Sequence, residues 1–377
     1  MQQSLKINSF ENRNLQKLKY LDLRGNTIKQ ISDDAFRVIN KLIYLNLNNN
    51  LLSALSEDTF KDLTRLEYLY LESNRIYRLD ENTFINLESL RFLDLDNNRL
   101  KTLSEAVFDG LDNVAQIRLS GNRIEKLIVG SFDGIEWTTQ KLYLGWNRIS
   151  TLKEGMFRDL IKLRLLSLRH NKIKTLPREI FKDLIALELI YLDGNRIEAL
   201  DSNLFHDQIR LKVLDISNNF IKDIDDDMFI RNCQLHSLYL SNNKFIVDSS
   251  KPFLRIPSLS LLKLSNCVVN HLTKNIFQNT PNLTAIALDN VFLSTIDIES
   301  IKQLKCLKFL SLHGNPIQCD CSLQRVRKWC IIQNIDLYWF TLDSGFLTIE
   351  EHKEPTCEFP DIFEDMPWSH MDANLKC

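Results

Sequence analysis

Apolar residues recur along this chain in one fixed pattern. The first clear unit reads Leu18-x-x-Leu21-x-Leu23-x-x-Asn26-x-Ile28, and the same order of Leu and Asn returns along most of the sequence. Alternation of Leu with other residues is typical of a short strand that buries one face. A single such strand cannot bury that face alone, but stacked copies form a continuous core. The pattern therefore predicts a solenoid of short parallel strands.

One polar position marks the repeat most clearly. Every step along it is 24 residues, apart from one step of 25 near Trp137. An Asn at the point where the chain leaves the strand can satisfy backbone groups of neighbouring turns through its side-chain amide. These ladder positions, which predict thirteen repeats, are Asn26, Asn50, Asn74, Asn98, Asn122, Asn147, Asn171, Asn195, Asn219, Asn243, Cys267, Val291 and Asn315.

A second ladder, of aromatic residues, runs in phase with the first. We expect these rings to stack as a buried spine beneath the convex side, where helix is short or absent. Together the two ladders predict an α/β solenoid, curved and right-handed, with a concave parallel β-sheet. The spine positions are Phe36, Phe60, Phe84, Phe108, Phe132, Phe157, Phe181, Phe205, Phe229, Phe253, Phe277 and then Ile301.

The repeat resembles the 24-residue typical class of leucine-rich repeat. That class is found mainly in extracellular proteins such as Toll-like receptors, Slit, chaoptin and the acid-labile subunit. The resemblance covers about residues 15–318 and implies a leucine-rich repeat horseshoe that binds its ligands. It identifies the superfamily and not a member within it.

Cysteines crowd the last part of the chain, where Cys319, Cys321, Cys357 and Cys377 resemble the cysteine-rich carboxy-terminal cap of extracellular leucine-rich repeat proteins. From the residues alone, four cysteines allow three pairings. The resemblance implies that Cys319 pairs with Cys357 and Cys321 with Cys377, and such disulfides imply an oxidising compartment. Zinc is the alternative, but adjacent ligands are usually spaced Cys-x-x-Cys and no suitable His pair occurs.

The remaining cysteines are left open by the sequence. Cys233, Cys267 and Cys306 lie within repeats, and Cys267 takes a ladder position, where a buried structural thiol is expected. Cys330 lies beside Trp329. It is interpreted as a free buried thiol, a partner for Cys306, or an intermolecular link.

The chain is predicted to have three parts. Residues 1–17 form a degenerate N-terminal edge without a cysteine cap, residues 18–318 form the thirteen repeats, and residues 319–377 form the cysteine-rich cap. The first residues hold no signal peptide, and the cysteine-bearing cap usual before the first repeat is missing, so we expect a fragment or a gene model that lacks its first exon. A cytosolic protein is the alternative, against which the cap argues.

Composition excludes several classes of protein. With 44% hydrophobic and 25% charged residues, the chain has enough apolar surface to fold. No apolar run approaches the roughly 20 residues that cross a bilayer. The net charge of −2 lacks the excess of positive charge that is typical of nucleic-acid-binding proteins. No catalytic or phosphate-binding motif occurs, so we expect no enzyme, no cofactor and no metal. The acidic run 223–227 suggests a calcium-binding site, but a solvated loop is the preferred interpretation.

The strand positions that are not Leu point to the concave face and supply the candidate ligand-binding residues. Aromatic and Arg side chains are enriched at interface hot spots, although Tyr in this repeat is also ordinary sheet filler. The aromatic–acidic patch comprises Tyr44, Tyr68, Tyr70, Glu72, Phe92, Asp94 and Asp96. The aromatic–basic patch comprises Arg118, Lys141, Tyr143, Trp146, Arg169, His170 and Tyr191. The sequon at Asn282 predicts a glycoprotein.

These features predict an extracellular ligand-binding or protein-interaction ectodomain, secreted or at the cell surface. The resemblance suggests an innate-immune or cell-surface receptor that takes part in signal transduction. The alternatives are a secreted matrix, adhesion or carrier protein and, less favoured, an intracellular scaffold. The expected partner is a protein or microbial ligand on the concave face. Homo- or heterodimers are left open, no nucleic acid is expected, and a membrane would be reached only through a segment absent from this chain.

Overall fold

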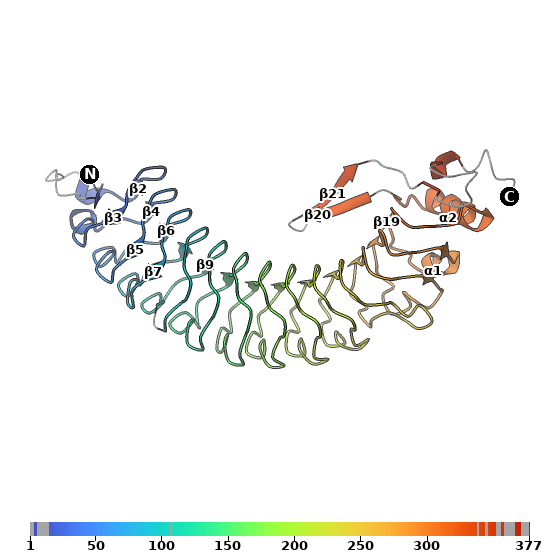
Figure 1. The fold of residues 1–377 in the computed structure, drawn as a ribbon, viewed down its shortest axis with the longest axis horizontal. Coiled ribbons are helices and arrows are strands. Elements are labelled where there is room, and N and C mark those ends of the chain that lie inside the picture. The colour runs from blue at the N-terminus through green and yellow to red at the C-terminus, as the bar shows by residue number, and fades with distance from the viewer. Residues whose placement is uncertain are drawn as a thin grey trace. The chain divides into compact units, whose positions relative to one another are not determined.

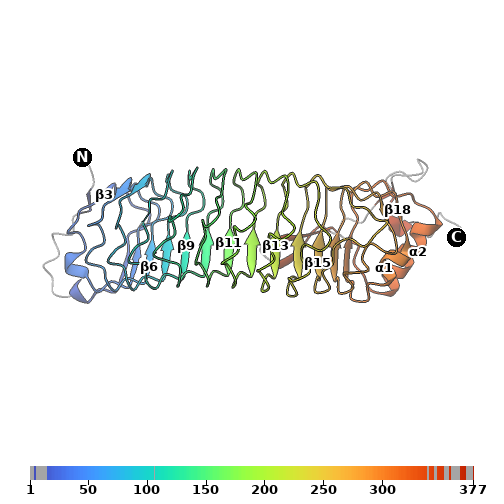
Figure 2. The same ribbon diagram turned by 90° about the horizontal axis from the view of Figure 1, so that it is seen from below.

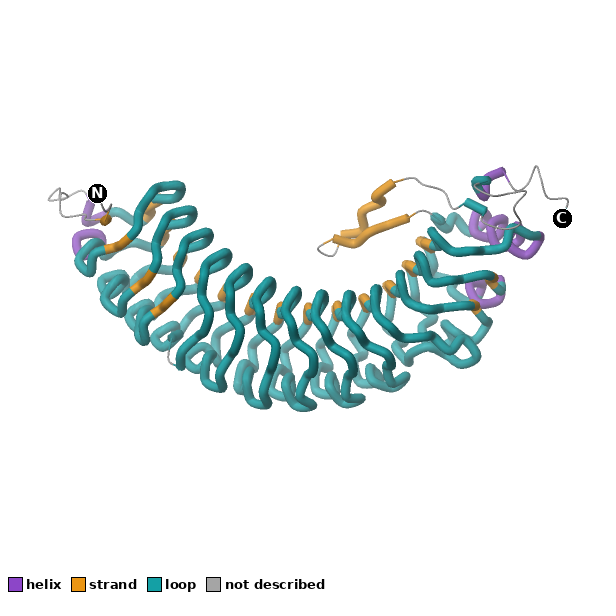
Figure 3. Tube along the Cα trace, viewed as in Figure 1, coloured by secondary structure: helices purple, strands orange, loops and turns teal. Residues whose placement is uncertain are grey.

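The computed structural model describes residues 4–5, 15–105, 107–337, 339–343, 346–351, 356–357, 366–370 and 377. The chain forms two compact units, Met1–Arg196 and Ile197–Cys377. Each unit is a solenoid of parallel strands joined by turns (Figure 1), and loops and turns make up most of its length (Figure 3). The predicted fold class, a parallel-strand solenoid with little helix, is confirmed.

The strands of the first unit form one parallel sheet on the inner side of its turns. They follow chain order and pair residue for residue: Lys141 lies opposite Gln116 and Leu142 opposite Ile117. The strands run side by side in one direction (Figure 2). They are β2 (Tyr20–Asp22), β4 (Tyr44–Asn46), β6 (Tyr68–Tyr70), β8 (Phe92–Asp94), β9 (Gln116–Arg118), β10 (Lys141–Tyr143), β11 (Leu165–Ser167) and β12 (Leu189–Tyr191).

The second unit repeats this arrangement. Its parallel strands also pair in chain order, with Leu238 opposite Leu262 and Leu262 opposite Ile286. They are β13 (Val213–Asp215), β14 (Ser237–Tyr239), β15 (Leu261–Lys263), β17 (Ala285–Ala287) and β19 (Phe309–Ser311).

The outer side of each unit is built from turns with short regular pieces. Two-residue strands pair there in parallel, and the helices are one turn or little more. In the first unit these pieces are β1 (Ser4–Leu5), β3 (Gln30–Ile31), β5 (Ala54–Leu55), β7 (Arg78–Leu79) and the 3-10 turns Leu15–Lys17 and Arg37–Ile39. In the second unit they are β16 (His271–Leu272), β18 (Thr295–Ile296) and α1 (Ile298–Lys302).

The phenylalanine spine is buried in both units, as predicted. Phe157 is 1% exposed, and its ring centre lies 5.6 Å from that of Phe132. Phe205 and Phe229 stack at 5.8 Å in the second unit. Ile301 takes the last spine position and is fully buried. Each repeat therefore adds one large apolar side chain to a continuous core.

The ladder Asn residues bond to the backbone of neighbouring turns, as expected. Asn98 Nδ2 donates to the carbonyl oxygens of Leu71 at 2.9 Å and Leu95 at 3.2 Å, and its Oδ1 accepts from Ile76 N at 3.0 Å. Where the ladder lacks Asn, the contacts change. Cys267 Sγ donates to Leu240 O at 3.5 Å.

The carboxy-terminal part contains a helix, two disulfides and a hairpin. Asp320 caps α2 (Cys321–Ile332) by accepting from the N–H groups of Ser322 and Leu323. The strands β20 (Trp339–Asp343) and β21 (Phe346–Glu351) pair antiparallel, and a 3-10 turn covers Trp368–His370. Among the described residues, no helix is long and apolar enough to cross a bilayer.

The cap contains both disulfides in the pairing that the resemblance implies. Cys319 bonds Cys357, and Cys321 bonds Cys377. Cys330 is a free buried thiol, which was one of its three interpretations, and burial raises its pKa to about 12. Burial likewise raises the pKa of the free Cys267 thiol to about 11.

Candidate functional site

The residue before each ladder position has a left-handed backbone, with φ between +51° and +70°. Glycine adopts this conformation freely and Asn tolerates it, whereas other L-residues are strained in it. Gly or Asn fills ten of the thirteen positions, and the exceptions are Ser73, Trp146 and His170. The positions are Gly25, Asn49, Ser73, Asn97, Gly121, Trp146, His170, Gly194, Asn218, Asn242, Asn266, Asn290 and Gly314.

Trp146 and His170 stand side by side in this left-handed row. Their rings stack with centres 3.8 Å apart and planes 19° apart. Trp146 is 60% exposed, so its side chain adds little to the core. A Cβ at Gly194, next in the row, would lie 2.5 Å from His170 Nδ1, so only glycine leaves room for the His170 ring there. The stack therefore lies on the surface, and Gly194 leaves the space that the His170 ring needs.

Arg169 lies beside this stack and is held by a buried carboxylate. Its Nη2 lies 3.2 Å from Asp193 Oδ2, and its guanidinium covers the Tyr191 ring at 5.5 Å. His170 Nε2 lies 3.6 Å from the same oxygen. Asp193 is 4% exposed, and its Oδ1 is buried with no hydrogen-bond partner. The carboxylate fixes Arg169 and His170 in place, and the sequence analysis did not single it out.

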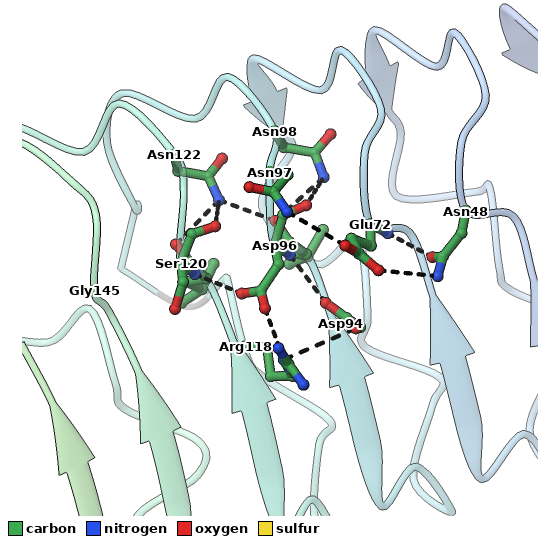
Figure 4. A network of polar contacts seen from close by, with 12 residues as sticks. Asn48, Glu72, Asp94, Asp96, Asn97, Asn98, Arg118, Ser120, Asn122 and Gly145 are labelled. Atoms are coloured by element: carbon green, nitrogen blue, oxygen red, sulfur yellow. Dashed lines mark hydrogen bonds and ion pairs between the residues drawn. The ribbon is translucent and has the colours of Figure 1, made fainter. Parts of the chain in front are cut away.

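Arg118 connects the two predicted patches. Its Nε lies 2.7 Å from Asp96 Oδ2 and 3.9 Å from Asp94 Oδ2, and its guanidinium covers the Tyr143 ring at 5.6 Å. Asp96 Oδ1 also accepts from Ser120 N (Figure 4). The two patches are therefore one continuous surface. The two aspartates are buried and paired, so they do not offer open negative charge.

Glu72 extends this network toward the amino-terminal strands. Its carboxylate accepts from Asn48 Nδ2 and from Asn97 Nδ2, each at 3.3 Å, and Glu72 N donates to Asn48 Oδ1 at 2.7 Å (Figure 4). Aromatic rings run beside it: Tyr70 lies 5.1 Å from Tyr44 and 5.0 Å from Phe92 between ring centres. The surface therefore continues across β4, β6 and β8.

Burial perturbs the titration of this network. It raises the pKa of the Asp94 carboxyl from 3.8 to about 6, with a smaller contribution from the charge of Asp96 and an opposing one from Arg118. Burial also raises the pKa of Asp96 and of the Tyr143 hydroxyl. Ionised Asp94 is therefore destabilising in the fold at neutral pH.

The first prediction concerns Asp94→Asn. The folded chain holds a proton on Asp94 between about pH 4 and 6 where the unfolded chain does not, so this carboxyl makes the fold less stable as pH rises through that window. We expect Asp94→Asn to match wild type near pH 4 and to be more stable by roughly 1–3 kcal/mol at pH 7. Urea denaturation at both pH values measures this. The control is the exposed Asp112→Asn, and a less stable Asp94→Asn at pH 7 would contradict the interpretation.

The remaining predicted site residues lie at exposed positions of the chain. Tyr68 and Lys141 lie on the inner sheet, both exposed, so all fourteen candidates lie on the inner face of the first unit or its edge. Asn282 is exposed, and its Nδ2 donates to Pro257 O at 2.9 Å. Ligand binding and glycosylation at these residues stay predictions. Among the described residues, no group of three His, Cys, Asp or Glu is placed to hold a metal ion.

The sequence matches a known family over most of its length. The family model for the leucine-rich repeat matches residues 16–76, 66–124, 138–197, 186–245 and 209–269. The chain therefore belongs to the leucine-rich repeat family. No curated protein matches it in sequence.

Solved structures share the fold. A chain of the TLR13–ssRNA13 complex is 24% identical with a TM-score of 0.68, over 85% of this chain and 54% of that one. A leucine-rich repeat protein of Leptospira interrogans is 25% identical with a TM-score of 0.72, over 89% and 88%. A chain of the Toll–Spatzle complex of Drosophila is 17% identical with a TM-score of 0.64, over 94% and 54%. This chain thus spans about half of the TLR13 chain.

Proposed function

We propose that this chain is an extracellular ligand-binding ectodomain that recognises a protein through the inner face of its first unit. The centre of the site is the Trp146–His170 stack with Arg169, and the aromatic residues of β4, β6 and β8 extend it. The proposed role is a binding module and not an enzyme, in keeping with the leucine-rich repeat scaffold.

The observation that carries this proposal is the exposed Trp146 in a left-handed backbone. A left-handed L-residue costs roughly 1–2 kcal/mol, and the ring stack with His170 returns about 0.5–1.5 kcal/mol. The fold therefore gains little from a tryptophan where Asn serves elsewhere. Backbone strain that packing does not fully offset is typical of functional positions. Trp and Arg are also the residues most often found at interface hot spots.

The charge of the surface favours a protein ligand over nucleic acid. Arg118 and Arg169 are each paired with a buried aspartate, which leaves the exposed Lys141 as the main added positive charge. Binding of a nucleic-acid backbone rests on several cations that neutralise phosphates. A solved relative is in complex with single-stranded RNA, so this ligand class belongs in the test.

An extracellular setting is proposed because the cap has two disulfides, which persist in oxidising compartments. The Toll–Spatzle complex, described as a hub of development and innate immunity, supports a receptor in immunity as the preferred role. A secreted matrix, adhesion or carrier protein is the second candidate. An intracellular scaffold would instead carry all four cap cysteines as thiols.

The test uses peptides selected from a phage-displayed library on the wild-type chain. We expect Trp146→Asn to lower the affinity of the chain for the selected peptides by about 30-fold, which corresponds to the loss of one hot spot of ~2 kcal/mol. The matched control is Trp137→Asn at the end of the preceding repeat, which removes a tryptophan that is 61% exposed and lies outside the site. It should change affinity by less than about twofold.

Both variants should stay within about 1 kcal/mol of wild-type stability. Equal peptide affinity for Trp146→Asn and wild type would reject the site. If a single-stranded RNA oligonucleotide binds the wild-type chain and loses affinity in Trp146→Asn, the proposal of a protein ligand is rejected. The location of the binding surface is then supported.

A further inference from the structure

A row of positive charges runs along one flank of the first unit. The residue directly after the ladder Asn is Arg or Lys in six successive repeats, and all six are exposed. The ladder Asn before each cation and the Ile or Leu after it are buried, so the cation between them points outward. We call these residues the basic row: Arg75, Arg99, Arg123, Arg148, Lys172 and Arg196.

The repeat itself does not require a cation at this position. In the other repeats the residue after the ladder position is mostly uncharged, and those repeats form the same solenoid turns. Six successive cations are therefore a property of this flank and not of the fold. The residues at this position in the other repeats are Thr27, Leu51, Phe220, Lys244, Val268, Phe292 and Pro316.

The charges of the basic row are largely unpaired. Among the described residues, Arg148 is its only member with a carboxylate in ion-pair distance, since Arg148 Nη1 lies 3.7 Å from Glu125 Oε1. The exposed position two residues further along each turn adds Lys101 and Lys174, but also Glu125 and Glu198. That position adds no net charge, so the positive charge of the row stays available to a ligand.

The spacing of the basic row is fixed by hydrogen bonds between turns. Each backbone N–H donates to a carbonyl oxygen of the preceding turn: Arg99 N to Ile76 O at 2.8 Å, and Arg123 N to Leu100 O at 2.9 Å. Neighbouring turns therefore lie about 5 Å apart here, as strands of a sheet do, and the six cations span about 25 Å. Cations on a fixed backbone lose little freedom on binding, which favours an extended ligand.

A linear polymer with repeated negative charges complements the basic row. Five of its six members are Arg, whose planar guanidinium binds oxyanions through parallel N–H groups. Nucleic acids and heparin-like polysaccharides both supply such oxyanions. Sites for single-stranded nucleic acid combine cations with aromatic rings on which bases stack, and no position of the row is aromatic. The two disulfides of the cap favour an oxidising compartment, which suits a polysaccharide of the cell exterior.

We propose that the basic row binds a linear sulfated polysaccharide, in addition to the ligand of the inner face. The choice of a sulfated polymer rests on the extracellular setting proposed above. The row follows the carboxyl ends of the inner strands, and Arg148 comes two residues after Trp146. The polymer therefore lies along one rim of the first unit and leaves the inner face open to a protein.

The test uses heparin as the probe and measures its affinity for the intact chain at several salt concentrations. Arg123→Gln combined with Lys172→Gln should lower the affinity about tenfold near 0.15 M salt, because two ionic contacts are lost. The slope of log affinity against log salt concentration should fall by between about 1 and 2.

The matched control is Arg65→Gln combined with Lys162→Gln. It removes the same charge from exposed turns that precede β6 and β11, away from the basic row. It should change the heparin affinity by less than about twofold, since salt screens distant charges. Equal loss of affinity in the two double variants would overturn the proposal, because net charge alone would then explain the binding.

Two further ligands test the class of polymer. Desulfated heparin keeps its carboxylates and should bind at least about tenfold more weakly than heparin, because most of its charge is gone. Equal binding of the two would reject a sulfated ligand. Tighter binding of a DNA duplex than of heparin would reject it as well, in favour of nucleic acid.

The same variants separate this proposal from that of the inner face. The peptides selected on the wild-type chain should bind the variant with Arg123→Gln and Lys172→Gln within about twofold of wild type. Heparin binding that does not depend on the basic row rejects this proposal alone. Peptide binding that does not depend on Trp146 rejects the inner-face site alone.

Discussion

Phe157→Ala is expected to destabilise the first unit by roughly 3–5 kcal/mol, the largest effect of any single substitution proposed for this chain. Phe157 is 1% exposed and stacks on Phe132 in the spine. Its removal takes away a large buried surface and leaves a cavity between turns that cannot close. Because each repeat contacts only its neighbours, the loss is concentrated in the adjacent repeats. Urea denaturation followed by tryptophan fluorescence measures it.

The control for this prediction is Phe220→Ala. Phe220 is 41% exposed and lies outside the spine, where it contacts Lys244 through a cation–π interaction at 4.5 Å. Its removal should change stability by less than about 1 kcal/mol. If Phe157→Ala cost as little as this control, the spine would not carry the core.

Asn98→Ala is expected to lower the free energy of unfolding by roughly 2–4 kcal/mol. The substitution leaves the buried N–H of Ile76 without its acceptor, at a cost of about 1–3 kcal/mol. It also removes one of the two donors to the buried carbonyl of Leu71, which keeps Asn74 Nδ2, and such a lost hydrogen bond adds about 0.5–1.5 kcal/mol. The same denaturation experiment applies. The matched control is Asn113→Ala: Asn113 is exposed and donates to Glu88 O. That control should lose less than about 1 kcal/mol, and similar losses from both variants would contradict the structural role of the ladder.

The regular features of the fold could be predicted because each repeat imposes the same requirement. A Leu at alternate positions, a ladder Asn and a spine Phe recur at one period, and one repeat predicts the next. The helix α2 was not anticipated, although Asp320 between two cysteines is a common helix N-cap. The hairpin of β20 and β21 was also missed, since it belongs to no repeat.

The site could be predicted only in part, because its behaviour depends on neighbours across the sheet. Alternation places Asp94 and Asp96 on the inner face, but it does not show that Arg118 of the next strand covers them. Parallel strands lie about 4.8 Å apart, so a carboxylate of one repeat reaches the next. The left-handed backbone of Trp146 does have a sequence signal: most equivalent positions in the other repeats hold Gly or Asn.

The central claim is that the inner face of the first unit binds the ligand. Hydrogen exchange of the chain, free and bound to the tightest selected peptide, tests it most directly. We predict slower exchange in 116–118, 141–147, 165–171 and 189–194, with no change in the outer turns around Phe132 and Phe157. Protection confined to the outer turns, or to the second unit, would contradict the claim.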